Sequence, residues 1–137
     1  MRTYIFLIIT SLIWACQSSQ EEVCHINAGV NPNGESEMAL FMRRIASECD
    51  LVKAQILKKE KAQFNFEATQ ILKATMTKGH NMDGAYTAYA KTFINQVEQF
   101  NENANKNNYN TIILNCINCH KTRCPGPIDR IKKLKLP

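Results

Sequence analysis

The sequence predicts an all-α fold, an antiparallel bundle of four helices that run up-down-up-down. Three observations support this prediction. Apolar residues recur every three or four positions in several segments between residues 36 and 124, which is the period of a helix with one buried face. No segment between turn signals alternates apolar and polar residues in the way of a strand. The links between the periodic segments are short, and short links make neighbouring helices antiparallel.

The first predicted helix runs from Ser36, which can cap its N-terminus, to Glu60. Its inner face carries Met38, Met42, Ile45, Cys49, Val52 and Ile56. The second predicted helix covers residues 63–78 and stops at Gly79, because glycine commonly ends helices. Its inner face carries Phe64, Ala68, Ile71 and Thr75.

The third predicted helix begins after Asp83, a good N-terminal cap, and ends before residue 101. Its inner face carries Tyr86, Tyr89, Phe93, Val97 and Phe100. Residues 101–110, NENANKNNYN, are expected to form a loop because asparagine competes with the helix backbone for hydrogen bonds. The fourth predicted helix covers Thr111 to Arg123, and the CPGP turn ends it because neither proline can continue a helix.

The N-terminal residues resemble a bacterial lipoprotein signal. Residues 1–15 hold one basic residue and an apolar stretch too short to span a membrane. Cys16 follows as the expected lipidation site, and residues 16–35 are its polar tether. The predicted organisation is therefore a signal peptide that is removed (1–15), the lipidated tether (16–35), the helical bundle (36–124) and a basic C-terminal tail (125–137). This organisation predicts an exported bacterial lipoprotein, periplasmic or anchored at the outer membrane.

The charge distribution argues against one class of partner. The chain has a formal net charge of +5, concentrated in the C-terminal residues RIKKLKLP rather than spread over a face. An exported protein also meets no nucleic acid, so we expect no nucleic-acid binding. No combination of nucleophile and base in the sequence suggests a hydrolase, and we expect no enzymatic activity.

The string CINCH, residues 116–120, has the spacing of a c-type haem attachment site. This chemistry needs the thiols of Cys116 and Cys119 for thioether bonds to the haem and the imidazole of His120 as an axial iron ligand. Cysteines three residues apart lie on one face of a helix within one turn. In an exported chain, the string predicts one covalently bound haem c.

Two other interpretations of the same residues stay open. The residues Cys116, Cys119, His120 and Cys124 have a spacing that can also supply three thiolates and an imidazole to a structural zinc ion. A plain disulfide between Cys116 and Cys119 is the other interpretation, since disulfides commonly stabilise small exported domains. Either alternative makes the chain a structural lipoprotein without haem.

The up-down-up-down topology places distant residues at one end of the bundle. The first helix starts there, the loop with His80 and Met82 lies there, and the fourth helix ends there. Residues 36–45 and the CINCH string are therefore expected to be neighbours, with the haem between them. Cys24 and Cys124 flank the bundle at the same end, so we predict a disulfide between them.

Two stretches, NPNGESEMALFMRRI and CINCHKTRCPGPIDRIKKL, together with the helical pattern, resemble helix-bundle cytochromes of the cytochrome c-prime family. In that family the CxxCH string lies in the last helix of a four-helix bundle. The resemblance implies covalent haem on Cys116 and Cys119, with His120 as the proximal ligand. Bundles of this kind are often dimers, so the resemblance also raises the expectation of a homodimer.

The second axial position decides between two functions. A methionine ligand, Met42 in preference to Met38, makes a six-coordinate iron suited to single-electron transfer with a redox partner protein. An iron without a protein ligand on that side instead binds a small gas such as nitric oxide or carbon monoxide. Arg43 or its neighbour Arg44 is expected to pair with a haem propionate. The predicted iron ligands are thus His120 and Met42, and the gas-binding alternative stays open.

Overall fold

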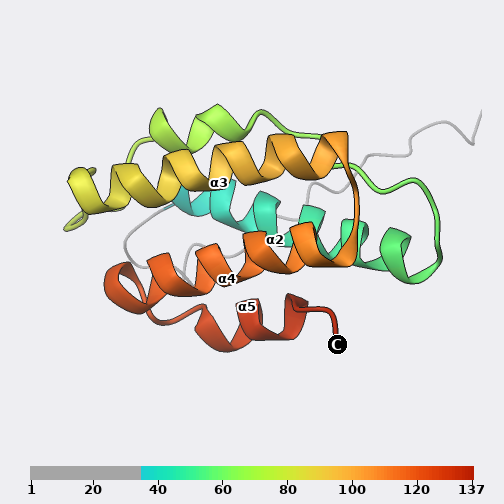
Figure 1. The fold of residues 1–137 in the computed structure, drawn as a ribbon. Coiled ribbons are helices and arrows are strands. Elements are labelled where there is room, and N and C mark those ends of the chain that lie inside the picture. The colour runs from blue at the N-terminus through green and yellow to red at the C-terminus, as the bar shows by residue number, and fades with distance from the viewer. Residues whose placement is uncertain (1–34) are drawn as a thin grey trace, which may run out of the picture. The chain divides into compact units, whose positions relative to one another are not determined.

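The computed structural model describes residues 35–137, which form an all-α fold (Figure 1). The helices are α2 (Glu37–Leu57), the short 3-10 helix η3 (Ala68–Leu72), α3 (Gly84–Glu102), α4 (Lys106–Arg123) and α5 (Ile128–Leu134). Helix α3 packs against α4 and η3, while α5 packs against α4 and α2. None of the helices in the described part of the chain combines the length and apolar composition that a membrane span needs. The predicted signal peptide, Cys16 and Cys24 lie outside the described residues.

The starts of two predicted helices are confirmed at their capping residues. The Ser36 hydroxyl accepts a hydrogen bond of 3.1 Å from the backbone N–H of Ala39 and caps α2. The Asp83 carboxylate accepts one of 2.9 Å from the backbone N–H of Tyr86 and caps α3. Both side chains satisfy N–H groups that a helix leaves free in its first turn, which is why helices begin at these residues.

The prediction of an α-helix over residues 63–78 is wrong. The chain is extended before η3, and Ala62 and Phe64 are buried while the residues between and beside them are exposed. On a helix, residues two apart point about 200° away from each other, so extended backbone is needed to bury both. The side-chain amide of Asn101 on α3 replaces the missing helical bonds. It accepts from the Phe64 N–H at 2.9 Å and donates to the Phe64 carbonyl at 3.3 Å.

The extended segment and η3 run antiparallel to α2. At the middle of α2, the backbone N–H of Asn65 donates to the Glu48 carboxylate at 3.2 Å. Near the start of α2, the N–H of Met38 donates to the carbonyl of Thr75 at 3.1 Å. This return segment therefore occupies the place that the sequence analysis gave to the second helix.

The asparagine-rich stretch 101–110 is mostly helical, which corrects the prediction of a loop there. Helix α3 continues to Glu102, and α4 already begins at Lys106. The side chain of Asn105 accepts a hydrogen bond of 2.9 Å from the N–H of Asn108 and caps α4. Asparagine weakens a helix interior but stabilises an N-terminus, and Tyr109, which is fully buried, fixes the first turn in the core.

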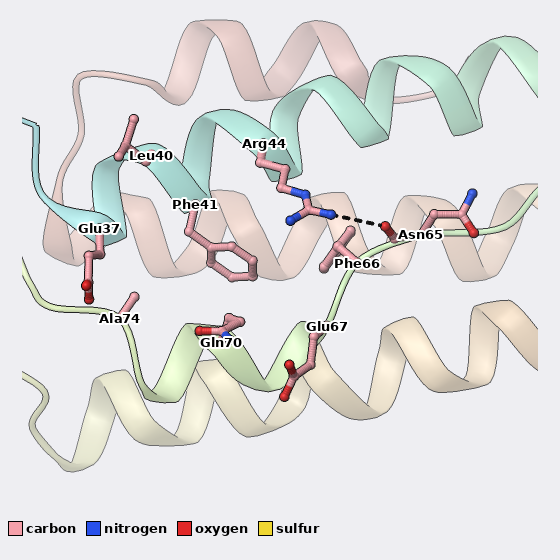
Figure 2. A pocket seen from close by; sticks show the side chains of 9 residues that line it. All are labelled: Glu37, Leu40, Phe41, Arg44, Asn65, Phe66, Glu67, Gln70 and Ala74. Atoms are coloured by element: carbon pink, nitrogen blue, oxygen red, sulfur yellow. Dashed lines mark hydrogen bonds between the residues drawn. The ribbon is translucent and has the colours of Figure 1, made fainter.

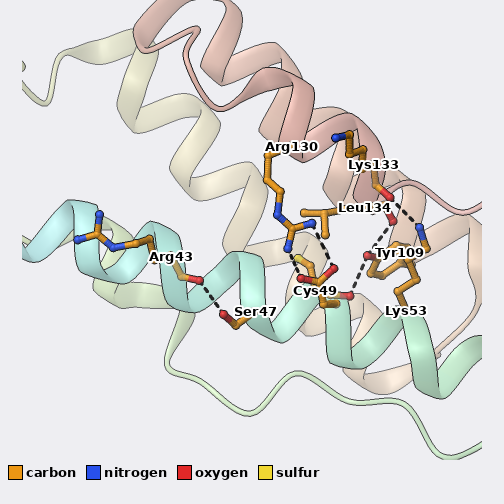
Figure 3. A network of polar contacts seen from close by, with 9 residues as sticks. Arg43, Ser47, Cys49, Lys53, Tyr109, Arg130, Lys133 and Leu134 are labelled. Carbon is orange, nitrogen blue, oxygen red and sulfur yellow. Dashed lines mark hydrogen bonds and ion pairs between the residues drawn. The ribbon is translucent and has the colours of Figure 1, made fainter. Parts of the chain in front are cut away.

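Residues 125–137, expected as a basic tail beyond the bundle, include helix α5. Ile131 and Leu134 of this helix, and Leu136 after it, belong to the core. Figure 3 shows how polar groups hold it. The Tyr109 hydroxyl lies 3.0 Å from the Cys49 carbonyl and 3.1 Å from the Leu134 carbonyl, and so links α4, α2 and α5. The Lys53 ammonium donates to the Lys133 carbonyl at 2.7 Å. The segment IDRIKKLKL is thus not only basic: the spacing of its apolar residues indicates that one side of it packs against the core.

Glu37 ties the start of α2 to the segment that follows η3. Its carboxylate accepts two hydrogen bonds of 2.8 Å, from the backbone N–H and from the hydroxyl of Thr75. These bonds hold the pKa of Glu37 below its ordinary value of 4.5.

We therefore expect the domain to lose stability as the pH falls below 4.5, and Glu37→Gln to remove part of that loss. A carboxyl group whose pKa is lowered by folding stabilises the fold above its unfolded pKa. That contribution is lost as the pH falls through the lower folded pKa. Urea unfolding at about pH 7 and about pH 3 measures the effect. Glu98→Gln, at an exposed position of α3, should behave like wild type. Equal acid sensitivity of Glu37→Gln and wild type would contradict the assignment.

Candidate functional site

A small cavity of about 40 Å³ lies between α2, η3, α3 and α4. It brings together four of the residues that the sequence analysis selected for haem binding: Met42, Cys116, Cys119 and His120. Ile45, Ile71, Tyr86, Tyr89 and Phe93 supply much of the remaining wall. The start of α2 and the end of α4 therefore meet at one end of the domain, as their order in the chain predicted.

Cys116 and Cys119 lie on α4 and are half-buried free thiols. Burial raises the pKa of Cys116 to about 12. Burial also raises the pKa of Cys119, the nearby Cys124 raises it further, and the charge of Arg123 opposes both. Both groups are therefore neutral thiols at neutral pH while they are buried in this way. A neutral thiol is a poor nucleophile and a poor metal ligand.

His120 is buried at the cavity and has one ring nitrogen already bonded. Its Nδ1 lies 3.1 Å from the backbone carbonyl of Cys124, and because a carbonyl only accepts, Nδ1 carries the proton. The Cys124 sulfur lies 3.2 Å from the same nitrogen. Burial lowers the pKa of His120, against the smaller opposing effect of the Cys124 carbonyl. The imidazole is thus neutral with the lone pair on Nε2, the state in which histidine binds a metal.

The two candidate methionines have different surroundings. Met38 is buried in the core, with its sulfur 3.6 Å from the Tyr86 hydroxyl. That hydroxyl has a single proton, and its shorter contact, 2.6 Å to the Ile71 carbonyl, takes it. Met42 lies one turn later and is the methionine that lines the cavity. The geometry therefore favours Met42 over Met38 as the residue that faces His120.

Arg43, which the sequence analysis expected to pair with a haem propionate, does not line the cavity. It is exposed and forms an ion pair of 2.6 Å with Glu35. Successive helical residues are rotated by about 100°, so a position next to Met42 is turned away from the cavity. His80 and Met82, whose loop was expected at this end of the bundle, are exposed and do not line the cavity either.

The sequence analysis missed one polar residue on the cavity wall, Asn115, and one close to Cys119 but outside the wall, Arg123. Asn115 is buried on the cavity wall, and its amide donates to the Tyr89 carbonyl at 3.1 Å. Arg123 forms an ion pair with Asp83, the residue that caps α3. Helical spacing was the signal that could have identified them. Position 115 precedes Cys119 by four residues and position 123 follows it by four, so all three lie on the same face of the helix.

A wider hollow of about 860 Å³ lies between α2 and residues 65–74 (Figure 2). The rings of Phe41 and Phe66 meet edge-on in it with centroids 5.9 Å apart. The Arg44 guanidinium donates to the Asn65 carbonyl at 3.4 Å across it. Its lining includes no cysteine, histidine or methionine. This hollow, although larger than the cavity, therefore offers none of the side chains that the sequence analysis selected to attach the haem or to bind its iron.

The donor residues fit a c-type haem. Porphyrin nitrogens supply most of the ligands to a haem iron, so the protein needs two thiols for attachment and one or two axial ligands rather than a full metal cluster. Within residues 35–137, no group of three or more His, Cys, Asp or Glu side chains is arranged to hold a metal ion. The cavity is far below the roughly 300 Å³ at which ligand pockets begin. Its walls therefore have to move apart to admit a haem.

The chain was compared with protein-family models, with curated proteins and with solved structures, and none of the three comparisons finds a match.

Proposed function

We propose that this chain is an exported c-type cytochrome of the helix-bundle kind, similar to cytochrome c-prime, that transfers single electrons at the cell envelope. It carries one covalent haem on Cys116 and Cys119, with His120 as the proximal ligand. The observation that carries the proposal is the neutral His120 imidazole, with Nδ1 bonded to the Cys124 carbonyl, in one cavity with both thiols and Met42. We further propose that the fold is an up-down-up-down bundle in which the extended segment and η3 replace the second helix.

Each of these residues has a defined task in the proposed site. The two thiols supply the attachment bonds, and their spacing on one turn of α4 fixes both to the same helix face. The Cys124 carbonyl orients the His120 ring and keeps Nε2 free to bind iron. Tyr86 and Phe93 exclude water from the cavity. When bound, the haem supplies one-electron iron chemistry, while the protein sets its potential through ligands and burial.

The second axial ligand is proposed to be Met42. A thioether ligand raises the reduction potential and leaves no open position on the iron, which suits electron transfer with a redox partner protein. The alternative function, binding of nitric oxide or carbon monoxide, is favoured by the apolar wall around Met42. Ile45, Ile71 and Phe93 offer no donor atom that would take the place of Met42.

Export and anchoring are part of the proposal and are supported by the sequence alone. Cleavage before Cys16 and lipidation of this residue would hold the domain at a bacterial membrane. The predicted Cys24–Cys124 disulfide stays a prediction, because Cys24 lies outside the described residues. From the sequence we likewise propose that the protein is not an enzyme and does not bind nucleic acid. We also propose that it forms a homodimer.

Carbon monoxide distinguishes the two haem functions. We expect the reduced full-length chain, made in a periplasm with haem-attachment machinery, to carry covalent haem and to resist carbon monoxide, because Met42 occupies the iron. Met42→Ala should bind the gas rapidly, with a large change in the absorption spectrum. Met82→Ala, an exposed methionine outside the cavity, is the matched control and should resist the gas like wild type.

Rapid binding by the wild-type chain would replace electron transfer with the gas-binding function. A wild-type chain without covalent haem would contradict both functions and favour the zinc- or disulfide-stabilised structural lipoprotein.

A further inference from the structure

Arg123 is a partly buried cation close to Cys119, one of the residues that line the cavity, although Arg123 does not line it itself. It stands at the end of α4, four residues after Cys119, so the two side chains follow each other on one helix face. Its side chain is only 21% exposed, although arginine normally keeps its charged group in water. The effect of its charge on the pKa of Cys119, described above, is consistent with this placement.

Only part of the Arg123 guanidinium has a partner. Its Nη2 donates to the Asp83 carboxylate, which is 42% exposed. Its Nε is buried and makes no hydrogen bond within the described part of the chain. A buried N–H without an acceptor is unfavourable, and it is rare in native proteins unless a ligand or ordered water completes it.

We propose that Arg123 binds a carboxylate of the cofactor, a haem propionate, through its free Nε–H and its charge. This inference rests on the proposed function, because the propionate belongs to the haem that Cys116 and Cys119 would carry. The guanidinium has five N–H groups in a planar fork, so it can donate from Nη2 to Asp83 and from Nε to a second carboxylate. Arg123 thereby takes the role that the sequence analysis gave to Arg43.

The other arginines of residues 35–137 are engaged elsewhere. Arg43 pairs with Glu35 in solvent, and Arg44 donates to the Asn65 carbonyl in the hollow of Figure 2. Arg130 pairs with Asp50, where α5 meets α2 (Figure 3). Among these arginines only Arg123 keeps a buried N–H without an acceptor.

The test compares the haem-loaded wild-type chain with Arg123→Gln and with the matched control Arg43→Gln. The resonance Raman band of propionate bending reports hydrogen bonding to the propionate directly, and the reduction potential reports the nearby charge. We expect Arg123→Gln to move the band to lower frequency and to lower the potential, because loss of the cation favours oxidised iron. Arg43→Gln should leave both values as in wild type.

An unmoved band in Arg123→Gln overturns the proposal even if the potential falls, because a charge also acts from a distance without contact. An equal shift in Arg43→Gln overturns it as well.

Asp83→Asn provides a second variant if Arg123→Gln does not accumulate. Asparagine keeps the cap of α3 but releases Arg123 from a competing carboxylate, so the band should move to higher frequency. An unmoved band in this variant overturns the proposal. Covalent haem is measured first in the wild-type chain. Its absence overturns the proposed function and this inference together, whereas haem with unmoved bands overturns only the assignment of Arg123.

Discussion

Replacing Cys116 and Cys119 together by serine is expected to abolish covalent haem, from one per chain to none. A hydroxyl does not form the thioether bond, and no other pair of thiols in the described residues lies on the wall of the cavity. Each single replacement should keep haem attached through the remaining thiol. The measurement is the mass of the denatured chain together with its haem absorption after extraction of non-covalent haem.

Cys124→Ser is the matched control for the double variant. Cys124 lies in the same part of the chain, but its contribution to His120 comes largely from the backbone carbonyl, which serine retains. In the haem interpretation this variant keeps its covalent haem. In the zinc interpretation Cys124 is a ligand, so the variant loses metal. Covalent haem in the double-serine variant, or zinc in a wild-type chain that loses it in Cys124→Ser, would contradict the proposed function.

Local signals predicted the starts of α2 and α3 well. The side chains of Ser36 and Asp83 each satisfy an N–H group in the first turn that follows them, and this interaction depends only on residues close in sequence. The cavity could also be expected, because the CINCH string ends one helix and the order of the elements brings the start of α2 next to it.

Contacts between residues that are distant in the sequence explain why the other predictions failed. Phe64 is extended because the side chain of Asn101 pairs with its backbone, and nothing near residue 64 announces a partner on α3. Helix α5 was missed because its stability depends on Tyr109 and Lys53, which lie on other helices. The sequence does not distinguish the surroundings of Arg43 and Arg123. The fold pairs Arg43 with Glu35 in solvent, whereas it pairs Arg123 with Asp83 and buries much of its side chain.

Phe100→Ala is expected to destabilise the domain by about 3 to 5 kcal/mol, the usual cost of removing a buried phenylalanine ring. Phe100 has no exposed surface. Its ring packs against Phe64 at a centroid distance of 5.1 Å and against Tyr109 at 6.3 Å. The substitution therefore removes contacts that join the extended segment, α3 and α4. Since small domains are stable by only about 5 to 15 kcal/mol, a large share of the total is at stake.

Urea unfolding followed by helical circular dichroism measures this loss as a fall in the midpoint at constant slope. Leu51→Ala, at a position of α2 that is 59% exposed, is the control and should change the free energy of unfolding by no more than about 0.5 kcal/mol. Phe100 does not line the cavity, so the haem-loaded variant should keep the wild-type response to carbon monoxide below its unfolding transition. A loss below about 1 kcal/mol would mean that this ring is not central to the core. An altered gas response in the folded variant would mean that the aromatic core and the cavity are coupled, because Phe64 and Tyr109 would then transmit the change to α4.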